Sequence, residues 1–156
     1  MIKQLMLNIS TAAVGSGPKE SLLGGTFAVI VTTITAALGG WDVALQALLY
    51  AMAFDYVTGL LAAIKDRRVD SDAMLWGGVR KIVVLGVIAL TVKFDVLFGY
   101  EEPVLRTIAF YFYLGREGLS IVENLGKLNI LVPQAIKDRL VQLKGEGEKD
   151  ASEVGK

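Results

Sequence analysis

The chain has 156 residues, 53% of them hydrophobic, and its 16 basic and 16 acidic side chains give a formal net charge of zero. This composition excludes a disordered chain, which needs low hydrophobicity, and a basic nucleic-acid binder, which needs an excess of cations. The sequence has no Cys and no His. It therefore has no disulfide, no thiolate nucleophile and none of the usual zinc sites, and we predict no catalytic, cofactor-binding or metal-binding residue.

The charged residues are unevenly distributed along the chain. Residues 21–64 hold only two of them, Asp42 and Asp55, whereas residues 126–156 hold eleven. Long uncharged blocks bounded by charged loops are typical of membrane proteins. We therefore predict an all-α membrane protein with four transmembrane helices and short amphipathic cytoplasmic segments.

Four apolar stretches account for the predicted transmembrane helices. They cover residues 21–41, 43–64, 82–99 and 104–125. About 20 helical residues cross the roughly 30 Å hydrocarbon core, so the first two are long enough and the third is just adequate. The fourth is the most polar, but its length and its run of aromatic residues still favour a helix in the bilayer.

The two ends of the chain are predicted to lie outside the membrane. Residues 1–20 read as a leader rather than a signal peptide, because polar residues interrupt any apolar core. Two translation starts, at Met1 and Met6, would give products that differ by one positive charge, although a single start is the simpler interpretation. After the last helix, residues 126–144 predict an amphipathic cytoplasmic tail, and residues 145–156 predict a disordered end.

Basic residues in the loops predict the orientation, because Lys and Arg resist translocation. The loop between the second and third helices, with its flanks, holds five basic residues and the tail holds six, whereas the two turns on the opposite side hold almost none. Both termini are therefore predicted to be cytoplasmic. Residues expected to anchor the chain at the membrane surface are Trp41, Trp76, Arg80 and Lys81.

Several polar side chains fall within the predicted transmembrane helices, where a charge costs several kcal/mol unless it is paired or hydrated. Asp55 lies about 15 Å from the cytoplasmic end of its helix, and Arg116 lies at a similar depth. This spacing permits an ion pair between them, which would either serve function or only fix helix packing. The expected polar pore or assembly residues are Asp55, Thr58, Gly59, Arg116, Glu117, Ser120, Glu123 and Asn124.

Three blocks of sequence, specific in their order and spacing, carry a resemblance to a known family. They are residues 54–63 (FDYVTGLLAA), residues 112–124 (FYLGREGLSIVEN) and residues 131–133 (LVP). In these blocks the chain resembles the toxin secretion/phage lysis holin family, and the resemblance covers roughly residues 49–144. Arg116 departs from the family pattern, where a small polar residue is expected.

The resemblance implies a small multi-span protein of bacteriophage origin that forms homo-oligomers in the host's cytoplasmic (inner) membrane. Such a protein permeabilises the lipid bilayer so that a phage endolysin reaches the peptidoglycan and the cell lyses; some relatives serve toxin export. A small membrane channel or toxin-export pore is the alternative. An enzyme is not predicted, because the phosphatidyltransferase motif that Asp55 to Gly59 faintly resembles needs further aspartates that are absent at the required spacing.

Overall fold

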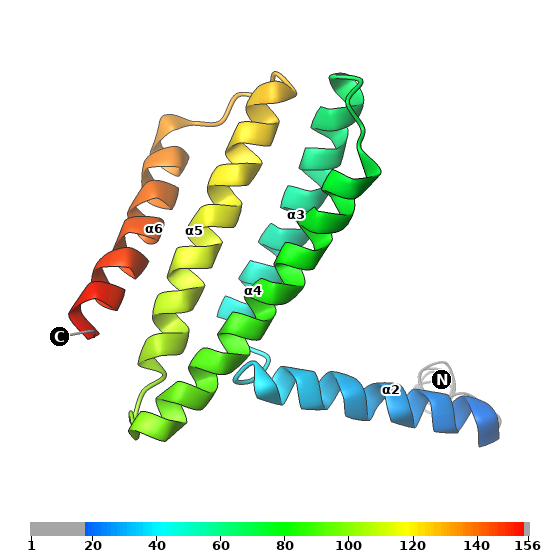
Figure 1. Ribbon diagram of the computed structural model, residues 1–156, viewed down its shortest axis with the longest axis vertical. Helices are drawn as coiled ribbons and strands as arrows, with labels where there is room; N and C mark the ends of the chain where they lie inside the picture. Colours follow the sequence, from blue (N-terminus) through cyan, green and yellow to red (C-terminus); the bar gives the residue numbers. More distant parts are fainter. Residues whose placement is uncertain (1–17, 155–156) are drawn as a thin grey trace, which may run out of the picture. The chain divides into compact units, whose positions relative to one another are not determined.

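The computed structural model describes the backbone of residues 18–154 and side chains from residue 22 to residue 146. Within this range the chain forms helices joined by short connections, and no strand (Figure 1). The predicted all-α architecture is therefore confirmed for the described residues, while the leader up to residue 17, with Met1 and Met6, lies outside them. The helices are α2 (Pro18–Ala37), α3 (Val43–Lys65), α4 (Ser71–Phe98), α5 (Val104–Lys127) and α6 (Gln134–Val154).

Aspartate side chains define where two of the helices begin. Asp42 accepts a hydrogen bond from the backbone N–H of Leu45 at 2.8 Å, which satisfies one of the free donors in the first turn of α3. At the start of α4, Asp70 likewise accepts hydrogen bonds from the backbone N–H groups of Asp72 and Ala73. At the other end of α4, Gly99 has a φ of 70°, a left-handed conformation that glycine adopts without the steric cost of a Cβ.

The helix bounds agree with the predicted spans at some places and differ at others. The helices α3 and α5 begin at the predicted residues and end within two residues of the predicted ends. In contrast, α4 begins eleven residues before position 82, because Asp70 caps it and no residue between Ser71 and Lys81 breaks it. The helix α6 continues through residues 145–154, where the sequence predicts a disordered end.

Among the described residues, α3 is the one helix that is long and apolar enough to cross a membrane by length and composition. The stretch Leu22–Ala37 is apolar but shorter. The helices α4 and α5 carry charged side chains within their length, and Asp95, Arg106 and Glu117 are buried inside the bundle. The prediction of four spans is therefore not confirmed by this criterion.

The chain divides into two units, one that ends at Ala37 and one that begins at Leu38. In the second unit α5 packs against α3, α4 and α6, and α6 runs back alongside α5 (Figure 1). The apolar core of this unit joins α3, α4, α5 and the turn before α3. It contains Leu38, Leu45, Leu48, Met52, Val84, Ile88, Ala109 and Phe110.

Polar side chains lie inside the second unit, and many large apolar side chains lie outside. The buried polar set is Thr58, Asp95, Arg106, Glu117 and Asn124. Exposed apolar side chains on the same helices include Tyr50, Val57, Val83, Val96 and Leu97. Soluble proteins rarely expose large contiguous apolar surfaces, whereas a bundle in lipid has to turn its polar groups inward.

Candidate functional site

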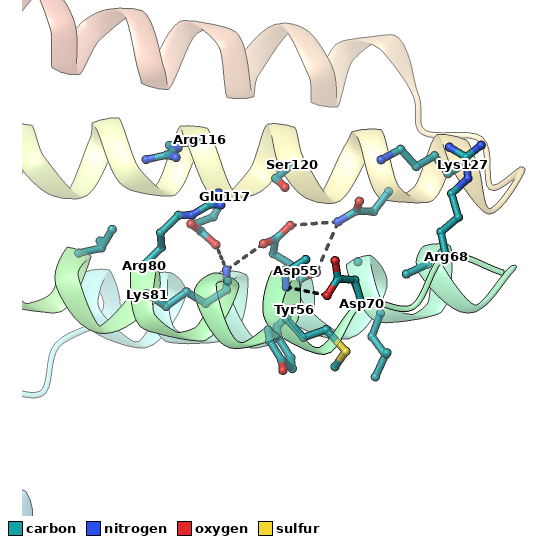
Figure 2. Close-up of a pocket in the computed structure, with 18 residues that line it drawn as sticks. Asp55, Tyr56, Arg68, Asp70, Arg80, Lys81, Arg116, Glu117, Ser120 and Lys127 are labelled. Atoms are coloured by element: carbon teal, nitrogen blue, oxygen red, sulfur yellow. Dashed lines mark hydrogen bonds and ion pairs between the residues drawn. The ribbon is translucent and has the colours of Figure 1, made fainter. Parts of the chain in front are cut away.

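A three-residue ion network joins the three helices α3, α4 and α5 (Figure 2). The Nζ atom of Lys81, from α4, lies 2.8 Å from Oδ2 of Asp55, from α3. The same Nζ also donates to Oε2 of Glu117, from α5. The side chains of Lys81, Asp55 and Glu117 are only 17%, 16% and 11% exposed. One ammonium group thus holds two carboxylates in a largely buried place.

Asn124 completes the network from two turns further along α5 than Glu117. Its Nδ2 atom donates to Oδ1 of Asp55 at 3.1 Å and to Oγ1 of Thr58 at 3.4 Å. Thr58 in turn donates its hydroxyl to backbone carbonyls of α3. A Cβ at Gly59 would lie 3.4 Å from Nδ2 of Asn124, at ordinary van der Waals contact, so the amide packs directly against this glycine.

The spacing of these residues follows from helix geometry. Asp55, Thr58 and Gly59 stand at positions i, i+3 and i+4 and therefore share one face of α3. Glu117 and Asn124 stand at i and i+7 and share one face of α5. Two carboxylates against one ammonium leave a formal charge of −1, which the amide of Asn124 partly offsets. Such groups are stable away from water only when each finds a partner, because desolvation is costly.

The predicted ion pair between Asp55 and Arg116 is wrong. Asp55 pairs with Lys81, and Arg116 is exposed. Successive helical residues are rotated by about 100°, so when Glu117 faces α3 and α4 its neighbour Arg116 points elsewhere. Glu123 is likewise exposed and outside the network, whereas Ser120 is half-buried near it.

Lys81, which the sequence places at the membrane surface, lies at the centre of the network, and its role as a surface anchor stays a prediction. The sequence interpretation placed it at the boundary of the third span, but α4 begins at Ser71 and Lys81 is ten residues inside the helix. Asp70 followed by Ser71 was the available signal for this earlier start. Trp41 and Trp76 are 62% and 61% exposed and Arg80 is exposed, so their role as surface anchors stays a prediction.

A cavity of about 490 Å³ lies over the ion network between α3, α4 and α5 (Figure 2). Asp55, Lys81 and Glu117 form part of its lining, together with Ser120 and Asn124. Four exposed basic side chains also line it: Arg68, Arg80, Arg116 and Lys127. The polar side of α5 therefore faces a hollow rather than a fully packed interface.

A second buried cluster, which sequence reasoning did not select, forms at the other end of the bundle around Asp95 of α4. Its carboxylate accepts hydrogen bonds from the backbone N–H groups of Leu105 at 2.7 Å and Arg106 at 2.9 Å. The first turn of α5 follows Pro103, which supplies no capping side chain. Asp95 therefore caps α5 from the neighbouring helix, and its negative charge suits the helix N-terminus.

The Arg106 side chain connects this cluster to the turn before α3. Its Nε donates to the carbonyl of Leu38 and its Nη1 to Oδ2 of Asp42, both at 2.7 Å. The guanidinium also lies over the ring of Phe110, 4.6 Å from its centroid. The hydrogen bond from Arg106 lowers the pKa of Asp42 below its ordinary value of 3.8, against the opposing effect of burial. Gly39, with a φ of 87°, leaves the space that the guanidinium fills.

Comparison with known proteins identifies the class of protein that this bundle represents. The profile of the bacteriophage holin family matches residues 32–145, so the chain belongs to the bacteriophage holin family. This family permeabilises membranes and is not enzymatic, and membership implies a location in the bacterial inner membrane. No solved structure matches the fold.

Individual relatives agree with this membership. An uncharacterized 14.9 kDa protein of Clostridium perfringens is 35% identical over 72% of this chain and 85% of its own length. An uncharacterized protein of Halalkalibacterium halodurans is 32% identical over 83% of this chain and 99% of its own length. A protein of Bacillus phage phi105 described as a probable holin is 31% identical over 65% of this chain and 77% of its own length.

Proposed function

We propose that this protein is a phage holin that oligomerises in the host cytoplasmic membrane and opens it for an endolysin. The observation that carries the proposal is the arrangement of polarity in the bundle of a holin-family chain. Ionisable groups meet inside the bundle at Lys81, while large apolar side chains cover its outside. That arrangement suits a lipid environment, and it keeps a polar face of α5 inside the bundle, from where a rearrangement can expose it.

The proposed topology has four spans, formed by α2 to α5, and cytoplasmic termini. The 28 residues of α4 extend over about 42 Å, which exceeds the hydrocarbon core, so this helix tilts or its first turns enter the headgroup layer. Its first turns carry Trp76 and Arg80, residue types suited to that layer. The basic connection between α3 and α4 stays on the cytoplasmic side because Lys and Arg resist translocation.

The proposed mechanism uses the polar face of α5. In a monomer, Lys81 satisfies Asp55 and Glu117, and no unpaired carboxylate of the network meets lipid. Above a critical density in the membrane, monomers rearrange so that the faces carrying Glu117, Ser120 and Asn124 border a shared aqueous lesion. The carboxylates then exchange their partner for water, which removes the need for the internal ammonium.

Co-expression in bacteria tests the lytic function. Cells that produce the chain together with a cytosolic murein hydrolase should lyse abruptly, whereas cells that produce either protein alone should keep an intact wall. If the pair causes no more lysis than either protein alone, and the membrane potential holds, the holin assignment is refuted.

A selective channel or a toxin-export pore is the second candidate, because the same polar face would border a narrower path. Release of cytosolic proteins of graded size separates a holin from a selective channel. A holin lesion passes a folded enzyme, whereas an ion channel collapses the potential and retains every protein.

A further inference from the structure

The lining of the cavity between α3, α4 and α5 carries more positive charges than negative ones, and its acidic side chains already have partners. Its lining includes five basic and three acidic side chains. Asp55 and Glu117 are taken up by Lys81, and Asp70 accepts backbone hydrogen bonds at the start of α4. Among the described side chains, no ion pair binds the other four bases, which are Arg68, Arg80, Arg116 and Lys127.

The four bases border the cavity along its length. Arg68 and Lys127 lie at the end where α3 and α5 finish, and Arg80 and Arg116 lie further along the helices (Figure 2). All four are exposed, so a ligand reaches them without displacing the packed core. Part of the lining is apolar instead, with Tyr56, Leu60, Ala63, Met74 and Val84 contributed by α3 and α4.

We propose that this cavity binds the phosphate of an anionic lipid headgroup. Arg side chains recognise phosphate oxygens through paired, charge-assisted hydrogen bonds, and basic pockets between transmembrane helices on the cytoplasmic side bind anionic headgroups. A volume of about 490 Å³ suits a small polar group, and the apolar part of the lining receives the start of an acyl chain. The choice of a lipid over a soluble phosphate rests on the membrane location in the proposed function.

The bound phosphate has a consequence for the network below it. It balances the excess of positive charge around the cavity and holds α3, α4 and α5 together at the end where the connection between α3 and α4 lies. Lipid of this charge therefore stabilises the closed bundle, and its loss favours the rearrangement that the proposed mechanism requires.

The test uses the full-length chain in nanodiscs of phosphatidylcholine with and without phosphatidylglycerol, with bound lipid counted by native mass spectrometry. The chain should retain phosphatidylglycerol. The double variant Arg68→Gln, Lys127→Gln, at the end of the cavity where α3 and α5 finish, should bind it on the order of 30-fold more weakly, at about 1 kcal/mol for each basic residue near an anionic group. The control Lys137→Gln, Arg139→Gln removes the same charge from α6, outside the cavity, and should bind like the unmodified chain.

Three outcomes would overturn the proposal. Equal loss in both double variants would show unspecific attraction of charge. Retention of phosphatidylglycerol by the Arg68, Lys127 variant would show that the cavity is not the site. Equally tight binding of soluble glycerol phosphate in pure phosphatidylcholine nanodiscs would assign the site to a free phosphate ester. Lysis is measured separately, in the co-expression experiment. Retention of lipid without lysis would refute the holin function alone. Lysis without retention of lipid would refute this lipid site alone.

Discussion

Replacing Lys81 by Met tests whether the ion network holds the three helices together. The change leaves Asp55 and Glu117 mostly buried and facing the place that the ammonium has left. Removing one partner of a buried ion pair typically costs about 3–5 kcal/mol, because the remaining charge is uncompensated. The three side chains keep some contact with solvent, so we expect the free energy of unfolding to fall by about 3 kcal/mol, the lower end of that range.

Unfolding in detergent micelles, followed by far-UV circular dichroism, measures this loss. The matched control is Lys93→Met, an exposed lysine of the same helix that lies outside the cavity and has no ion pair with a described side chain, and it should change the free energy by no more than about 0.5 kcal/mol. A triple variant that also carries Asp55→Asn and Glu117→Gln should recover most of the loss, since no buried charge remains. A Lys81→Met variant as stable as the unmodified chain, or a triple variant no better than the single one, would refute the role of the network.

Three further changes test other parts of the bundle. Asn124→Leu removes the buried amide that binds the network, and should lower the free energy of unfolding in the same assay by about 1–3 kcal/mol. Acidification should remove the contribution of Asp42 to the free energy of unfolding, because the lowered pKa of Asp42 makes that contribution complete above pH 3.8 and lost as the pH falls below it. The thermal midpoint of the Asp42→Asn variant should lack this part of the pH dependence. Gly115→Ala places a Cβ 2.7 Å from the backbone nitrogen of Lys144, so spin labels on α5 and α6 should move apart, whereas Gly126→Ala, with open space around it, should leave their distance unchanged.

Much of the helical layout could be predicted from the sequence, because charged residues bound the apolar blocks. The helices α3 and α5 begin directly after Asp42 and Pro103, which local sequence marks as boundaries. The polar face of α5 could also be predicted, since a spacing of seven places Glu117 and Asn124 on one side of a helix. These features depend only on local sequence.

The partners in the site could not be predicted in the same way. Spacing along the chain gives the depth of Asp55 but not the rotation of α4 and α5 around it, and that rotation selects Lys81 in place of Arg116. The contact of Arg106 with the carbonyl of Leu38 joins residues far apart in the sequence. Such pairs depend on tertiary packing, which no local pattern contains.

The contact between α5 and α6 limits how the chain can sit in a bilayer. Gly115 and Gly118 let α6 pack closely, and in the proposed topology both glycines lie near the middle of the membrane. The helix α6 carries charged side chains at Lys137, Asp138 and Arg139, which cannot face hydrocarbon. While α6 stays on a membrane-spanning α5, its outer face therefore has to meet water or other subunits. In the proposed topology the contact thus belongs either to an assembly with a hydrated interior or to the chain before full insertion. In the proposed mechanism the two glycines would then link the position of α6 to the step at which the membrane opens.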